Sequence, residues 1–205
     1  MSSIDSVLDK NRAWAASMTA SDPDFFKNLA GGQQPEYLWV GCSDSRVPAS
    51  RVAGFEPGEA FVHRNIANQV ILSDLNFLSV LRYAVAVLKV KHIVVCGHYN
   101  CGGVAAAVSN GSVGVIDHWL EGIRDTNDAN ADQLAGIVGE EERLARLCEL
   151  NVVEQVRNVC RTTAVRTAWD EGQELSVHGL IYSLEDGLLK DLNVEAKKRP
   201  GMYLA

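Results

Sequence analysis

Two short polar clusters, each placed directly after a run of residues typical of a buried β-strand, constrain the fold of this chain most. In the first cluster Cys42 follows the apolar run 37–41, and in the second His98 and Cys101 follow the run 92–97. In an open α/β sheet, ligands are held beyond the carboxyl ends of the strands. The interval between the clusters is about two βα units long. The two clusters therefore predict one shared site at the end of a parallel sheet.

The rest of the chain predicts strands that alternate with helices. This alternation favours an α/β fold with a mainly parallel central β-sheet flanked by helices and preceded by an N-terminal helical arm. We expect strands at 37–41, 60–64, 92–97 and 174–182 with an edge strand at 188–194, and helices at 4–18, 22–30, 74–89, 114–124 and 140–171, with a polar connection after 124. Residues 1–205 are expected to form one domain, whose apolar arm at 1–32 packs on a partner subunit.

Composition narrows the class of protein. The net charge of −7 disfavours a nucleic-acid partner, and no apolar run reaches the ~20 residues that a membrane helix needs. No secretory signal is visible at the N-terminus. The five cysteines are odd in number and are not spaced as a disulfide framework. We therefore expect reduced thiols and a cytoplasmic protein.

The residue types in the two clusters point to zinc. Two thiolates and an imidazole, from Cys42, His98 and Cys101, form a Cys₂His ligand set with a fourth position to fill, which predicts one Zn²⁺ per chain. If 42–46 is extended, Asp44 and Arg46 point to the same side as Cys42. Asp44 then has two candidate states: bound to zinc, or paired with Arg46 while zinc is open to water.

Two other interpretations of the clusters stay open at this point. Zinc bound by Cys42, Asp44, His98 and Cys101 together would be a closed structural site. A metal-free cysteine nucleophile with a histidine base is the other. The glycines that follow Cys101 are expected to let the backbone approach whatever occupies the site; they are Gly102 and Gly103.

Both clusters resemble the signature of the β-class carbonic anhydrases. The family pattern Cys-x-Asp-x-Arg is matched by 42–46, and His-x-x-Cys by 98–101. Segments 61–68, 149–152 and 178–187 are also similar to that family, so the resemblance covers nearly the whole chain.

The resemblance implies reversible hydration of carbon dioxide to bicarbonate and a proton by a zinc-bound hydroxide. Asp44, oriented by Arg46, would accept a hydrogen bond or a proton from the zinc water and would gate the metal. The backbone near Gly102 and Gly103 would position bicarbonate. The family assembles as homodimers or homotetramers, in which N-terminal helices wrap the partner subunit.

One branch of the family binds a regulatory bicarbonate that switches the aspartate onto zinc. This chain matches that branch in residue type at four positions, which are Trp39, Gly41, Arg64 and Tyr182. Arg64 would pair with the anion, and the polar hydrogens of Trp39 and Tyr182 would donate to it. The alternative is that Arg64 is a structural partner in an ion pair and that the aromatic rings are packing residues.

Two further functions remain as alternatives. The same scaffold can act on carbon disulfide or carbonyl sulfide, and no residue of this chain separates that activity from carbon dioxide hydration. A zinc-stabilised module without catalysis is the other, and the Asp44–Arg46 pair argues against it because a structural site gains little from an arginine that competes for its ligand.

Overall fold

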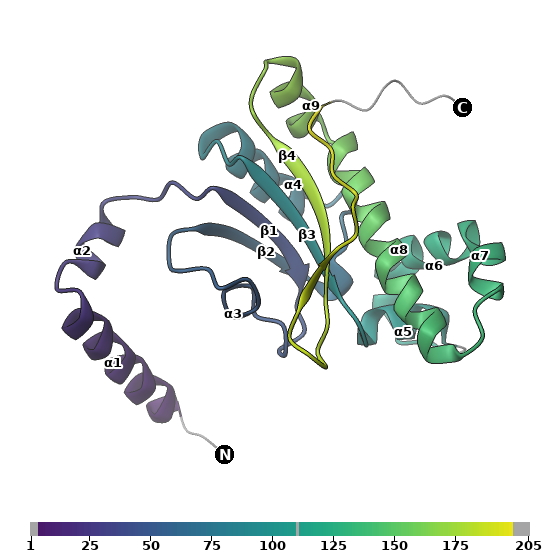
Figure 1. The fold of residues 1–205 in the computed structure, drawn as a ribbon, viewed down its shortest axis with the longest axis horizontal. Coiled ribbons are helices and arrows are strands. Elements are labelled where there is room, and N and C mark those ends of the chain that lie inside the picture. Colours follow the sequence, from purple (N-terminus) through teal and green to yellow (C-terminus); the bar gives the residue numbers. More distant parts are fainter. Residues whose placement is uncertain (1–3, 110, 199–205) are drawn as a thin grey trace. The chain divides into compact units, whose positions relative to one another are not determined.

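The computed structural model describes residues 4–109 and 111–198, and its centre is a five-stranded sheet (Figure 1). The strands are β1 (Tyr37–Cys42), β2 (Ala60–Asn65), β3 (His92–His98), β4 (Ser176–Tyr182) and β5 (Leu189–Asp191). Their order across the sheet is β2-β1-β3-β4-β5. Strands β1 to β4 are parallel, and only the pairing of β4 with β5 is antiparallel. The predicted α/β fold is thereby confirmed.

The strand order reverses direction between β1 and β3. After β1 the chain adds β2 on one side, and it then returns to add β3 on the other side of β1. Such a reversal leaves a crevice at the carboxyl ends of the two central strands, because their connections depart in opposite directions. Cys42 ends β1 and His98 ends β3, so the topology alone brings the two predicted clusters to this crevice.

Helices surround the sheet and build the core with it. They are α3 (Ala49–Ala53), α4 (Leu75–Arg82), α5 (Gly102–Val108), α6 (Ile116–Ala129), α7 (Ala131–Ala135), α8 (Glu140–Arg161) and α9 (Thr163–Asp170), with a 3₁₀ turn η1 at Ile66–Asn68 and a π-helical turn η2 at Tyr83–Val87. One sheet face buries Leu38, Val40 and Ile93 with α4, α8 and α9. The other face carries Trp39 and Val94 against α3. Among the described helices, none has the length and apolar content needed to cross a membrane.

Close contact between α8 and the sheet depends on two glycines. A Cβ atom on Gly97 would lie 2.6 Å from the Cγ2 atom of Val152, and one on Gly179 would lie 3.2 Å from the Cγ1 atom of the same residue. Side chains at these positions would force α8 outward. Because both are glycine, α8 can lie directly against β3 and β4 (Figure 1).

The predicted helix 140–171 is wrong at one point, because the chain breaks at Thr162. This residue has extended backbone (φ −66°, ψ 147°), and its hydroxyl accepts a hydrogen bond from the backbone N–H of Val165. A threonine in this position is an N-cap, which starts α9 as a new helix. The apolar spacing continues through the break, so hydrophobic periodicity does not reveal it.

Three other predicted boundaries differ from the structure. The helix expected at 74–89 is α-helical only to Arg82 and then becomes the π-helical turn η2. Lys89 then adopts a left-handed conformation (φ 57°), which turns the chain into β3. The edge strand expected at 188–194 is limited to β5, because Asn193 also has positive φ. The helix expected at 114–124 extends to Ala129, and the connection after it contains α7.

The N-terminal arm forms a compact unit that ends at Gln34, separate from the unit that begins at Pro35. It consists of α1 (Ile4–Ser21) and α2 (Phe25–Ala30), close to the two predicted helices. Within the arm, the ring of Trp14 packs edge-to-face on Phe25 and Phe26. Helix α1 nevertheless has no buried residue.

Candidate metal centre

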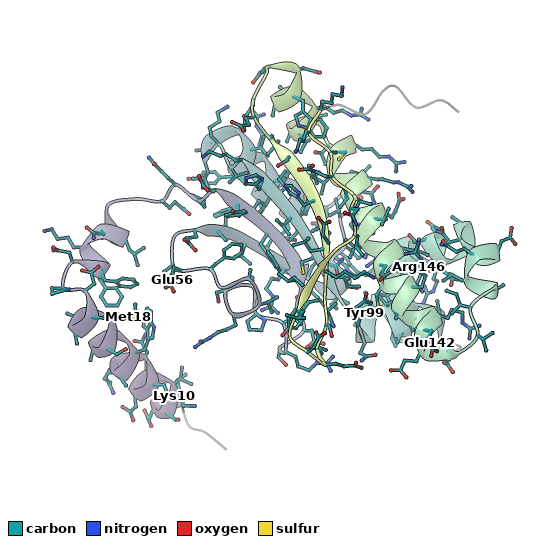
Figure 2. All side chains as sticks on the ribbon, viewed as in Figure 1. Lys10, Met18, Glu56, Tyr99, Glu142 and Arg146 are labelled. Atoms are coloured by element: carbon teal, nitrogen blue, oxygen red, sulfur yellow. The ribbon has the colours of Figure 1, made fainter. Side chains whose placement is uncertain are left out.

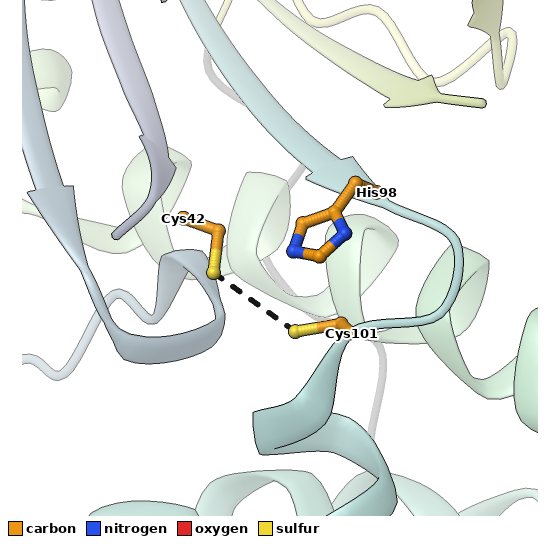
Figure 3. Close-up of side chains that lie close together, drawn as sticks. All are labelled: Cys42, His98 and Cys101. Atoms are coloured by element: carbon orange, nitrogen blue, oxygen red, sulfur yellow. Dashed lines mark hydrogen bonds between the residues drawn. The ribbon is translucent and has the colours of Figure 1, made fainter. Parts of the chain in front are cut away.

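Three potential metal ligands converge at the carboxyl ends of β1 and β3. Cys42 comes from the end of β1, His98 from the end of β3, and Cys101 from the residue that precedes α5 (Figure 3). Their ligand atoms all lie within 4.8 Å of one another, and the two sulfur atoms are 4.0 Å apart. All three residues are buried. The structure therefore brings the predicted Cys₂His set together.

The imidazole of His98 is oriented for metal binding. Its Nδ1 lies 2.8 Å from the carbonyl oxygen of Tyr99. A carbonyl can only accept, so Nδ1 carries the proton and Nε2 has a free lone pair. His98 is 1% exposed, and Nε2 has no hydrogen-bond partner among the residues that the structure describes. A buried acceptor without a partner is costly, and a metal ion at Nε2 would remove that cost.

The charges of the site favour a cation. A hydrogen bond from the Cys101 thiol lowers the pKa of Cys42, and the resulting Cys42 thiolate, together with burial, raises the pKa of Cys101. Burial alone would lower the pKa of His98, but the Cys42 thiolate and Asp44 outweigh it, so that this pKa is raised. Both thiols can ionise together only if positive charge lies between them. A divalent cation with soft ligands, as zinc is, fits this donor set.

Asp44 is paired with Arg46 in this structure. Its two carboxylate oxygens accept bonds from the Arg46 guanidinium, from Nε at 3.0 Å and from Nη2 at 2.7 Å, and the backbone N–H of Arg46 donates to it at 2.9 Å. These bonds hold the pKa of Asp44 well below its usual range. Its Oδ2 atom lies 3.8 Å from Nε2 of His98. Of the two predicted states, the structure thus has the carboxylate on arginine and directly beside the ligand cluster.

Arg64 holds the loop that carries Cys42 and Asp44. From β2, its guanidinium donates to the carbonyl oxygens of Cys42 (2.8 Å), Asp44 (2.6 Å) and Val47 (3.4 Å). Its partners are thus main-chain carbonyls rather than a carboxylate. The loop geometry, and with it the direction of the Asp44 side chain, depends on these bonds.

The other three residues of the predicted bicarbonate site lie on the same sheet face as Arg64. Gly41 is the register partner of Arg64, and Trp39 lies two residues earlier on β1. A Cβ atom on Gly41 would approach the indole Nε1 of Trp39 to 2.6 Å, so the indole N–H lies over the glycine. Tyr182, at the end of β4, pairs in register with His98.

The two glycines after Cys101 differ in their surroundings. A Cβ atom on Gly102 would meet no other atom within 4 Å, whereas one on Gly103 would lie 3.0 Å from the Cβ atom of Ala67. Gly102 thus leaves open space beside Cys101. Gly103 instead allows the segment that contains Ala67 to pack closely on the start of α5.

A charged cluster behind His98 ties its strand end to α8. The Tyr99 hydroxyl donates to Glu149 at 2.7 Å, and Glu149 also accepts from Arg146 at 2.7 Å and from Lys190 at 2.8 Å. Tyr99 and Arg146 are labelled in Figure 2, near α8. Because Tyr99 also supplies the carbonyl that orients His98, this cluster holds the imidazole in place.

The sequence pattern did not show that several buried polar residues bind the loop after β2. Asn151 and Gln155 are buried on α8, and Gln69 is buried in the loop after β2. Trp119 on α6 also reaches this loop. A signal for the first pair was present, since two amide side chains four residues apart interrupt the apolar stripe of the 140–171 segment.

Comparison with known proteins identifies relatives of this chain. The family model described as carbonic anhydrase matches residues 37–189. A curated carbonic anhydrase from Emericella nidulans is 52% identical over 191 residues, which cover 93% of this chain and 84% of that protein. A curated carbonic anhydrase from Candida albicans is 37% identical and covers 94% of this chain and 69% of that protein.

Solved structures that are similar to this chain are also carbonic anhydrases. One of two tetrameric β-carbonic anhydrases from Sordaria macrospora is 44% identical with a TM-score of 0.89, and the match covers 93% of this chain and 96% of that one. A Coccomyxa β-carbonic anhydrase in complex with acetazolamide is 42% identical with a TM-score of 0.92, covering 97% and 90%. Since the matched region spans both strand ends and every ligand of the cluster, this chain belongs to the β-class carbonic anhydrases and is a carbonate dehydratase, a lyase.

Proposed function

We propose that this chain hydrates carbon dioxide with one zinc ion held by Cys42, His98 and Cys101. Hydration of carbon dioxide is the general reaction of the family. The observation that carries the metal assignment is the buried Nε2 atom of His98, which faces two sulfur atoms and has no hydrogen-bond partner among the described residues. A zinc ion held by these residues would supply an acidified water molecule, so that a nucleophile for carbon dioxide would be available near neutral pH.

Asp44 acts as a fixed hydrogen-bond acceptor in this proposal. Its pKa lies far below its usual range because Arg46 holds it from two sides. A carboxylate of such low pKa is a poor base near neutral pH, since proton transfer to it is strongly uphill. Its contribution is therefore to orient the reacting water and keep one lone pair of that water directed at carbon dioxide. The same pairing with Arg46 keeps the carboxylate off the metal, which is the basis of the proposed gate.

The substitution Asp44→Asn tests this role. We expect the variant to keep about one zinc per chain, because three ligands remain, but to lose about 100-fold or more in kcat for hydration. The reason is that the amide lacks the charge that pairs with Arg46 and can present a donor where an acceptor is needed. Stopped-flow hydration and metal analysis on the same sample measure both quantities.

The matched control is Asp117→Asn. Asp117 is also paired with an arginine, Arg124, at 3.1 Å, but it belongs to α6 and not to the ligand cluster. Its loss should leave hydration unchanged. Wild-type hydration in Asp44→Asn would remove Asp44 from the mechanism.

We assign substrate and product binding to the backbone beside Cys101. Gly102 has open space where a side chain would stand, so carbon dioxide and bicarbonate can lie against the main chain at that point. Gly103, one residue further along, would contribute only main-chain atoms to this surface, because it packs against Ala67.

We further propose that bicarbonate regulates the enzyme through Arg64. The supporting observation is that Arg64 donates to the carbonyl oxygens of Cys42 and Asp44, in the loop that carries the Asp44 side chain. An anion bound near Trp39, Gly41 and Tyr182 would compete for this guanidinium. Loss of its bonds to the loop would free Asp44 to turn from Arg46 toward the metal and close the site.

Arg64→Ala therefore separates the two interpretations of this residue. Regulation through Arg64 predicts that bicarbonate inhibition weakens several-fold, together with some loss of basal activity because the loop loses its support. Inhibition is measured from initial hydration rates at increasing bicarbonate, with Arg51→Ala, an exposed arginine on α3, as the control. Unchanged inhibition in Arg64→Ala would leave this residue with a structural role only.

The arm supports a proposal of self-association, as a homodimer or homotetramer. Helix α1 buries no residue, although it carries apolar side chains that are 44–71% exposed, Ile4, Val7, Leu8 and Trp14. A second copy of the chain would cover them, and the Sordaria macrospora relatives are described as tetrameric. Sedimentation of the full chain should give a dimer or larger species that dissociates in Leu8→Asp, while a wild-type monomer at micromolar concentration would contradict the proposal.

The compartment remains a prediction. All five cysteines are free thiols in the structure, and two of them must stay reduced to bind metal. This requirement is consistent with the cytoplasm, although an Arabidopsis thaliana relative at 34% identity is named as mitochondrial.

A further inference from the structure

A pair of histidines lies at the opposite end of the strand that carries His98. His92 begins β3 and is the register partner of Ser176 on the neighbouring strand β4, and His178 lies two residues further along β4 (Figure 1). Because side chains alternate along a strand, these three residues lie on one face of the sheet. At ~3.3 Å per residue, the strand places His92 roughly 20 Å from His98. The pair is therefore separate from the candidate metal centre.

Three polar atoms of this histidine cluster are in mutual contact. Nδ1 of His92 lies 2.8 Å from Oγ of Ser176 and 3.2 Å from Nε2 of His178, and the same Oγ lies 2.8 Å from that Nε2. Each ring nitrogen offers either one proton or one lone pair, and the hydroxyl offers one proton. Whichever nitrogen is protonated, a proton or lone pair must be shared between two neighbours. The three contacts therefore cannot all be full hydrogen bonds.

The spacing of the two nitrogens matches that of ligands on one metal ion. Ligand atoms at ~2.0–2.1 Å from a tetrahedral ion are about 3.3 Å apart, and the two nitrogens are 3.2 Å apart. Imidazole is a common ligand of zinc and of other divalent transition ions. A cation bound by the lone pairs of both nitrogens and of the hydroxyl oxygen would satisfy all three atoms together.

A carboxylate favours the tautomer of His178 that a metal ligand needs. Oε1 of Glu195 lies 3.6 Å from Nδ1 of His178, an ion-pair distance, and Oε2 of Glu195 pairs with Lys197 at 3.1 Å. Negative charge beside Nδ1 favours a proton there, so that Nε2 presents its lone pair to the cluster. Burial also lowers the pKa of His178. The ring is therefore neutral, and able to bind a metal, near neutral pH.

Neighbouring contacts hold Glu195 and His92 in place. Val177 forms an antiparallel bridge with Ala196, the residue after Glu195, through main-chain hydrogen bonds of 2.8 and 2.9 Å. This bridge fixes the backbone of Glu195 beside β4. The ring of Tyr37, on β1, stacks on His92 with the ring centroids 5.2 Å apart. Both imidazoles are thus oriented by contacts from outside the cluster.

The connection from Glu195 through His178 to Ser176 is also that of a hydrolytic triad, in which a histidine takes the proton of a nucleophilic serine. The burial of the serine argues against this use. Ser176 is 7% exposed, and its Oγ also contacts the second imidazole. The side chain of His178, in contrast, is 25% exposed, so the edge of the cluster is open to an entering ion and to water.

We propose that His92, Ser176 and His178 form a second metal site, which binds one Zn²⁺ or a similar divalent transition ion and links the amino-terminal ends of β3 and β4. Glu195 is a positioning residue that acts through His178. The site shares no residue with the candidate metal centre, so it goes beyond the proposed function and does not depend on it. Because it lacks thiolates, it binds zinc more weakly than that centre and fills only at higher free zinc.

Equilibrium dialysis of the untagged, zinc-loaded chain against increasing free Zn²⁺ tests the site. We expect the wild type to take up about one zinc per chain more than His178→Gln, since an amide is a poor ligand for this ion. The matched control is His118→Gln, because His118 is exposed on α6, and it should bind as much zinc as wild type. Glu195→Gln should keep the site but weaken its zinc affinity about 10- to 100-fold.

Co²⁺ added to the zinc-loaded chain identifies the ligands. Cobalt bound by imidazole nitrogens and oxygens gives visible d–d bands without a sulfur-to-metal charge-transfer band, so the spectrum separates this site from the thiolates. We expect these bands in wild type and in His118→Gln, and we expect His178→Gln to lack them.

Each outcome decides the proposal. If wild type takes up no additional zinc, or if both His178→Gln and His92→Gln retain that uptake, the second site is overturned and the two imidazoles are only hydrogen-bonded. If His178→Gln does not fold, His92→Gln decides by the same two readouts. A wild-type chain whose only bound zinc is the amount lost in His178→Gln would support this site and contradict the proposed function.

Discussion

Two buried thiols 4.0 Å apart set the constraint on which the rest of this structure depends. They can both ionise only if a cation lies between them, and His98 presents its unprotonated nitrogen to the same point. The parallel pairing of β1 with β3 brings these groups together, and Gly97 allows α8 to pack close behind them. The sheet, helix α8 and the loops at the strand ends together position the three residues of this candidate cation site.

Two arginines bind different parts of the loop beside that site. Arg46 binds the Asp44 side chain and keeps the carboxylate ionised beside the cluster of Cys42, His98 and Cys101. Arg64 binds the main chain of the same loop. Because both arginines act on one short loop, a change at either one alters where the carboxylate points. This coupling would allow a single segment to serve both of the proposed roles, catalysis and regulation.

The convergence of Cys42, His98 and Cys101 could be predicted from the sequence. Two of these residues end strands and the third follows soon after His98, and parallel strands place their carboxyl ends at one edge. The state of Asp44 could not be predicted, since the same residues are compatible with a bond to zinc or to Arg46. Other features depended on tertiary context. Thr162 ends a helix inside a continuous apolar stripe, so the stripe does not reveal the break. Asn151 fits that stripe in size, but its amide donates a hydrogen bond to a loop far away in sequence. Hydrophobic periodicity predicts which residues are buried, but it does not predict which partner a buried polar side chain binds.

The first experiment to perform is stopped-flow hydration of carbon dioxide by the purified chain, with zinc assayed on the same sample at pH 7 and pH 9. We expect about one zinc per chain and fast hydration at pH 9, with a steep fall in hydration rate by pH 7 if Asp44 closes the site. Stoichiometric zinc without hydration at either pH would contradict the proposed function. Turnover of carbon disulfide or carbonyl sulfide by that inactive sample would then assign the scaffold to another substrate.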